Sequence, residues 1–157
     1  MKKIVSIALC LILVLSLAAC GGESSSSVKL DVTQVYEKLI QTATLPEMLE
    51  LDESLMLDYC GIKAEDVKAA KVVICADSLR TDEIWVIDAK DANSAKTIAD
   101  LAQKRLTKKG EESITYSPEQ YAVVEKAQLI QTGNFLVLIV SPDVDTLAAA
   151  VRQMAGI

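Results

Sequence analysis

The stretch AQLIQTGNFLVLIVSPDV, residues 127–144, contributes most to deciding the fold of this chain. Two short runs rich in β-branched and large apolar residues, 127–132 and 135–140, flank Gly133 and Asn134. Such a pair of residues between two apolar runs is a strong signal for a β-hairpin. The stretch therefore predicts two antiparallel strands.

A helix is expected directly after this hairpin. Ser141 suits an N-cap and Pro142 suits the first helical position. Apolar residues then recur at helical spacing and share one face: Val144, Leu147, Ala148, Val151 and Met154.

A second pair of strands is predicted upstream, at 72–76 and 84–89, joined by the polar loop 77–83. Residues 91–108 return to helical spacing. Near the end of that segment lies a basic cluster, which we interpret as a solvated helix end that suits the negative pole of the helix dipole, rather than as a binding patch: Lys104, Arg105, Lys108 and Lys109.

The N-terminal half is expected to begin with a helix that ends before Pro46. Asp31, with Gln34 three residues later, resembles a capping box at its start. Residues 45–62 predict short helical turns, and residues 116–125 predict a loop or short helix around Pro118.

These elements follow the order helix, strand, strand, helix, strand, strand, helix. Paired strands with intervening helices indicate a small α+β domain, with an antiparallel sheet of about four strands and helices packed mainly on one face. The strands at 72–76 and 135–140 are apolar on both sides. We therefore expect the N-terminal helical region, or another copy of the chain, to cover the second face.

The chain begins with a signal-peptide pattern: Lys2 and Lys3 precede an apolar stretch over residues 4–19. The stretch is short for a membrane-spanning helix, although an uncleaved span is the alternative. It ends in four residues that resemble the lipobox of bacterial lipoproteins: Leu17, Ala18, Ala19 and Cys20.

That resemblance implies lipid joined to Cys20 through a thioether, and cleavage directly before it. Ordinary secretory cleavage after Ala19 is the alternative. We therefore expect a lipoprotein signal peptide at 1–19, a lipidated cysteine with a flexible Gly/Ser tether at 20–30, and one domain at 31–157. The expected location is the outer face of the cell membrane, because two acyl chains are enough for stable anchoring.

Cys60 and Cys75 are the two cysteines of the expected domain. Outside the cytoplasm they could pair, and the closed loop would contribute about 3 kcal/mol. A free buried thiol is the favoured alternative, because Cys75 lies in an apolar run.

The composition restricts the possible chemistry. The chain has no histidine, which excludes histidine-activated nucleophiles and histidine-containing zinc sites. Two cysteines in the expected domain cannot make a four-cysteine zinc site, and no phosphate-binding glycine motif is present, so no metal or cofactor is expected. The formal net charge of −6 disfavours nucleic acid. Trp85 is expected to pack in the core rather than to stack on a sugar.

Carboxylates near the ends of the predicted strands are the remaining candidates for acid–base or calcium chemistry: Asp77, Asp82, Glu83 and Asp88. No calcium-loop pattern accompanies them. With 22 acidic residues in the chain, some clustering by chance is expected.

Several short motifs resemble a family of small Gram-positive lipoproteins that carry a domain of unknown function, type 4358. They are DEI at 82–84, DAKD at 88–91, YSPEQY at 116–121, GNF at 133–135 and VSPD at 140–143. The motifs are turns and caps, so the resemblance implies fold and location but no active residues.

We expect a non-enzymatic, lipid-anchored domain that binds an envelope component or a protein partner, or that self-associates. A carboxylate-dependent envelope hydrolase and a small solute-binding lipoprotein are the alternatives.

Overall fold

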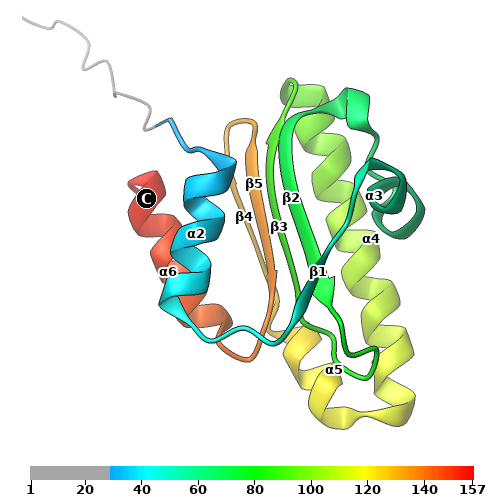
Figure 1. The fold of residues 1–157 in the computed structure, drawn as a ribbon. Helices are drawn as coiled ribbons and strands as arrows, with labels where there is room; N and C mark the ends of the chain where they lie inside the picture. Colours follow the sequence, from blue (N-terminus) through cyan, green and yellow to red (C-terminus); the bar gives the residue numbers. More distant parts are fainter. Residues whose placement is uncertain (1–28) are drawn as a thin grey trace, which may run out of the picture.

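The computed structural model describes residues 29–157, which form a five-stranded antiparallel sheet flanked by helices (Figure 1). Across the sheet the strands follow the order β1-β2-β3-β5-β4. The predicted α+β class is confirmed, with one strand more than expected. Along the chain the elements are α2 (Val32–Thr42), β1 (Met48–Glu50), α3 (Glu53–Cys60), the short 3-10 helix η2 (Ala64–Asp66), β2 (Val67–Cys75), β3 (Glu83–Ala89), α4 (Ala92–Tyr116), α5 (Pro118–Glu125), β4 (Gln128–Thr132), β5 (Phe135–Val140) and α6 (Val144–Ala155).

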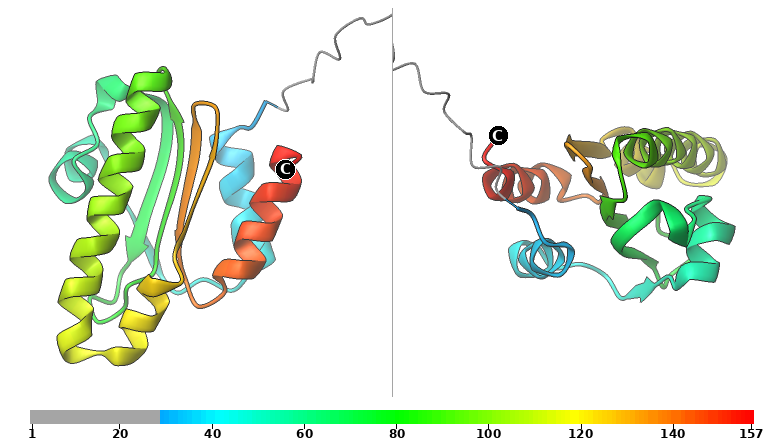
Figure 2. Two further views of the ribbon diagram at one scale, coloured as in Figure 1. Left: turned by 180° about the vertical axis from the view of Figure 1, so that it is seen from behind. Right: turned by 90° about the horizontal axis from the view of Figure 1, so that it is seen from above.

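Helices cover both faces of the sheet (Figure 2). Successive side chains of a strand point to opposite faces, so Trp85 and Ile87 of β3 join a core with α3, α4 and α5. Ile84 and Val86 join a second core with α2 and α6. The expectation that helices lie mainly on one face is corrected, because the strands are apolar on both sides and each side needs a cover. The predicted cover of the second face by the N-terminal helix is confirmed.

The hairpin of β4 and β5 is confirmed, with Thr132 paired to Phe135 around the turn. Gly133 has a φ of 58°, at the first central position of the turn. A type II′ hairpin requires a positive φ at that position, and glycine adopts it without a steric cost. The Gly-Asn pair thus fixes the register of β5, which is buried along its whole length.

The region 45–62 differs from the predicted helical turns in one respect. Met48–Glu50 forms the edge strand β1, which pairs with the end of β2. A strand of three residues leaves no readable alternation, so its partner rather than its own sequence determines it. The helix α3 follows, with Asp52 accepting a hydrogen bond from the backbone of Leu55 at 2.9 Å and Gly61 ending it at a φ of 75°.

The last helix begins later than predicted. Its first residue is Val144, and Asp143 is the N-cap. Ser141 and Pro142 belong to a turn in which the Ser141 hydroxyl accepts a hydrogen bond from the backbone of Asp143 at 3.2 Å. The predicted apolar face of this helix is confirmed, since Val144 and the apolar residues one and two turns later are buried.

Candidate functional site

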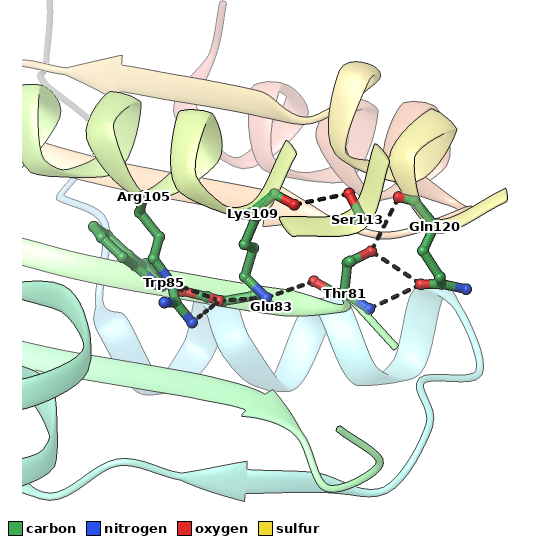
Figure 3. Close-up of polar contacts among 7 residues, drawn as sticks. All are labelled: Thr81, Glu83, Trp85, Arg105, Lys109, Ser113 and Gln120. Carbon is green, nitrogen blue, oxygen red and sulfur yellow. Dashed lines mark hydrogen bonds and ion pairs between the residues drawn. The ribbon is translucent and has the colours of Figure 1, made fainter. Parts of the chain in front are cut away.

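Glu83, the first residue of β3, is fully buried, and four nitrogen atoms surround its carboxylate (Figure 3). The indole nitrogen of Trp85 donates to Oε1 at 2.7 Å. Arg105 donates through Nε at 3.1 Å to Oε1 and through Nη2 at 3.0 Å to Oε2. Nζ of Lys109 lies 2.9 Å from Oε2. We call Glu83, Trp85, Arg105 and Lys109 the Glu83 cluster.

Secondary structure brings these four residues together. Glu83 and Trp85 are two residues apart in a strand and therefore share one face of the sheet. Arg105 and Lys109 are four residues apart in α4 and therefore share one face of the helix. That face packs on the sheet, so both cations meet the carboxylate away from water.

A hydrogen-bond network extends the cluster toward α5. Lys109 Nζ donates to the carbonyl oxygen of Thr81 at 3.1 Å. The backbone N–H of Thr81 donates to Gln120 Oε1 at 2.8 Å, and its hydroxyl donates to the same oxygen at 3.0 Å. The Ser113 hydroxyl donates to the carbonyl oxygen of Lys109 at 2.7 Å. These bonds join the β2–β3 loop to α4 and to α5 at the end of the sheet where β3 begins (Figure 3).

A pocket of about 200 Å³ lies beside the cluster; we call it the loop pocket. Arg105 and Lys109 line it from α4, and the lining also includes Tyr59 and Tyr116, which are 52% and 60% exposed. The complete lining is Tyr59, Ile74, Cys75, Ser78, Arg80, Thr81, Arg105, Lys109, Glu112 and Tyr116. The pocket thus combines buried cations with exposed aromatic side chains.

The charges around the loop pocket are mostly paired. Asp82 is buried and accepts from Arg80 through Nε at 3.0 Å and Nη2 at 3.2 Å. Burial acts to lower the pKa of Arg105, but its hydrogen bond with Glu83 and the charge of that carboxylate outweigh burial and raise the pKa. Arg105 therefore stays charged in its partly desolvated position.

The structure has Cys60 and Cys75 as free, buried thiols. Cys75 lines the loop pocket, whereas Cys60 belongs to the core under α3 and α4. Burial, together with the nearby charge of Glu83, raises the pKa of the Cys60 thiol to about 12. At neutral pH this thiol is protonated and a poor nucleophile.

The basic cluster of α4 is not a solvated helix end, so this prediction is wrong. The helix continues to Tyr116, and Lys109 is buried while Arg105 is largely so. Lys104 and Lys108 alone face solvent. Helical periodicity in the sequence indicates that Arg105 and Lys109 are buried. The stripe of Ala95, Ile98 and Ala102, which faces the core, continues at helical intervals through Arg105, Lys109 and Ser113.

The carboxylates considered from the sequence do not converge on one centre. Asp82 pairs with Arg80, Glu83 with Arg105 and Lys109, and Asp88 with Lys68 at 3.5 Å. Asp77 accepts a hydrogen bond from the backbone of Leu79. Within residues 29–157, no three Cys, Asp or Glu side chains are grouped so that they could hold a metal ion. Trp85 is 1% exposed, which confirms its predicted core position.

A larger hollow of about 480 Å³ lies between α4 and α5. Its lining includes Leu106, Ile114 and Tyr121, with Glu111 and Glu125 as its charged residues. It lacks the convergent cations of the loop pocket, and we therefore take the loop pocket as the candidate site.

The predicted lipobox, Leu17, Ala18, Ala19 and Cys20, lies outside the described residues. In the part of the chain that the structure describes, none of the helices has the length and apolar character needed to cross a bilayer.

Residues 41–141 match the family described as Domain of unknown function (DUF4358), and the chain belongs to this family. The match includes every residue that lines the loop pocket and the whole Glu83 cluster. No curated protein and no solved structure matches the chain.

Proposed function

We propose that this protein is a lipid-anchored extracytoplasmic domain that binds a partner or an envelope component without catalysing a reaction. Cys20, at the end of the lipobox-like sequence, would carry the lipid and hold the domain at the outer face of the membrane. The loop pocket would be its binding site.

One observation carries the proposal: Arg105 and Lys109, which are hydrogen-bond donors, line the same pocket as two exposed tyrosines. Tyrosine and arginine are enriched at binding surfaces, because both combine a large apolar area with polar groups. The Glu83 cluster fixes the two cations in place, so they lose little conformational freedom when a ligand binds.

A carboxylate-dependent hydrolase has weaker support. Such an enzyme needs two acidic groups that face each other across a cleft. Asp82 and Glu83 are buried in ion pairs with arginine and lysine and do not line the pocket, and Glu112 is the one carboxylate in its lining. We therefore propose binding rather than hydrolysis.

A photocrosslinking experiment in living cells tests the proposal. A photoreactive phenylalanine analogue replaces Tyr116 or Tyr59 in the full-length protein, and Lys38 serves as the control position. Lys38 is exposed on α2, which covers the opposite face of the sheet. We expect defined adducts from both tyrosine positions and none of the same adducts from Lys38. Identical adducts at all three positions, or none at either tyrosine, would contradict the proposal.

A further inference from the structure

Three cations line the loop pocket, and the two buried carboxylates that they contact neutralise two of these charges. Asp82 and Glu83 are 2% and 0% exposed, whereas three cations contact them: Arg80, Arg105 and Lys109. Arg80 pairs with Asp82, so the excess belongs to Arg105 and Lys109, which share Glu83. A charge removed from water without a counter-charge is unfavourable, and an anion that enters the pocket would relieve this imbalance.

Both cations also have donors to spare. A guanidinium has five N–H groups and an ammonium has three. In the described part of the chain, the hydrogen bonds of Arg105 involve Nε and Nη2, and Nζ of Lys109 contacts Glu83 and Thr81. This leaves Nη1 of Arg105 and one N–H of Lys109 for a ligand. Both side chains line the loop pocket.

Glu112 is the one acidic residue in the pocket lining, and its charge acts on Arg105 but offsets the excess only in part. Its side chain is 52% exposed and lies 3.8 Å from Nζ of Lys108. Water screens such a surface carboxylate strongly, whereas the Glu83 cluster is shielded from solvent. Part of the positive excess thus remains in the pocket.

The size and charge of the pocket restrict the ligand. A volume of about 200 Å³ is small for a drug-sized molecule, so it suits a single functional group with a few attached carbons. An excess of one charge matches a carboxylate better than a doubly charged phosphate. A carboxylate also has two oxygens, which can accept hydrogen bonds from Arg105 and from Lys109.

We propose that the loop pocket binds molecules through one carboxylate group, which contacts Arg105 and Lys109 while the rest of the molecule lies against Tyr59 and Tyr116. This inference rests on the proposed binding function and names the class of its ligand. The carboxylate could belong to a free small acid or to the C-terminus of a peptide, and the experiment separates these two sources.

Calorimetric titration of the full-length protein in detergent provides the test. The probes are N-acetylalanine, its amide, the peptide Gly-Gly-Ala, its C-terminal amide, and inorganic phosphate. We expect at least one acid to bind about tenfold or more tightly than its amide, because the amide lacks the charge that the two cations need. Binding of N-acetylalanine alone would indicate a free acid, and preference for the peptide would indicate a C-terminus.

Three variants separate a binding role from a structural one. Arg105→Gln should weaken binding of the acid about tenfold or more, whereas Lys108→Gln, a change at an exposed neighbour, should leave it unchanged. Glu83→Gln increases the positive excess and should tighten binding. A purely structural cluster would give the same loss of binding for Arg105→Gln and Glu83→Gln. Because the comparison of acid and amide uses the unchanged protein, the test stands even if a variant fails to fold.

The inference is overturned if acids and amides bind equally, if phosphate alone binds, or if no probe binds. In each of these cases, adducts that form specifically at Tyr59 and Tyr116 in the crosslinking experiment would still support the binding function. If those adducts are also missing, the proposed function fails together with the carboxylate inference.

Discussion

The guanidinium of Arg105 makes a bidentate contact with the carboxylate of Glu83, with Nη2 3.0 Å from Oε2 and Nε 3.1 Å from Oε1. The contact joins the middle of α4 to the first residue of the central strand. Lys109, one helical turn further along α4, contacts the same carboxylate. This arrangement connects the fold to the candidate site, because the same two cations line the loop pocket.

Removing the carboxylate should destabilise the fold strongly. Glu83→Ala leaves two cations without their buried counter-charge, and we expect the free energy of unfolding to fall by about 3–5 kcal/mol. Urea unfolding of the full-length protein, followed by the fluorescence of Trp85, measures this change. Trp85 is the one tryptophan in the chain and contacts Glu83 directly.

Asp88→Ala is the matched control for that experiment. Asp88 lies in the same strand and pairs with Lys68 at the surface, so we expect a loss below about 1 kcal/mol. Equal losses for the two variants would show that Glu83 has no special structural role.

The lysines of α4 should differ in their reactivity. Nζ of Lys109 is buried in the Glu83 cluster, whereas Lys108 has a side chain that is 68% exposed. An amine-acetylating reagent should therefore modify Lys109 about tenfold or more slowly than Lys108, because Lys109 must first leave its ion pair. Peptide mass spectrometry over time gives both rates, and similar rates would contradict the burial of Lys109.

Cys60 should make stability depend on pH in the alkaline range. Its pKa rises from an ordinary 9.0 to about 12 in the folded protein, mainly through burial. As the pH rises, the Cys60 thiol therefore loses its proton at a lower pH in the unfolded chain than in the folded protein. The contribution of this thiol to stability is complete below pH 9 and is lost as the pH rises toward 12. The free energy of unfolding should decrease across this window.

A comparison with Cys60→Ala isolates this effect. The difference in unfolding free energy between the unchanged protein and the variant should fall with a slope approaching about 1.4 kcal/mol per pH unit above pH 9. Urea unfolding from about pH 8 to about pH 10.5 measures it, since this range brackets the start of the titration. A difference that stays constant over this range would show that Cys60 titrates normally in the folded protein.

Two glycines with positive φ should respond differently to alanine. At Gly61 a Cβ would lie 3.0 Å from Cδ2 of Leu101, so Gly61→Ala adds crowding to backbone strain and should cost about 2 kcal/mol. At Gly133 nothing lies within 4 Å of the added Cβ, so strain alone should cost about 1 kcal/mol. Thermal unfolding ranks the two variants, and the reverse order would contradict the packing of α3 against α4.

Much of the fold could be predicted where local sequence and tertiary packing agree. The hairpin at Gly133 and the helix capped by Asp31 have their signals in adjacent residues. The start of β2 could not be read this way, because Val67–Lys71 contains alanine and lysine, which are weak strand formers. Pairing with β3 holds that segment in the sheet: Val67 lies opposite Ala89 and Ala69 opposite Asp88.

The candidate site was harder to predict, because charge alone does not reveal burial. Arg105 and Lys109 stand beside Lys104 and Lys108 in the sequence, and the four look alike by composition. Helical spacing separates the inward pair from the outward pair. The partner on the sheet, Glu83, is distant in sequence and becomes apparent only when α4 packs on β3.

The proposed function depends most directly on the lipid at Cys20. Cells that produce the unchanged protein or Cys20→Ser are grown with labelled fatty acid, and the label and the membrane fraction of each protein are measured. We predict label and membrane association for the unchanged protein, and loss of both for Cys20→Ser. Equal labelling and equal membrane association of the two proteins would contradict the account.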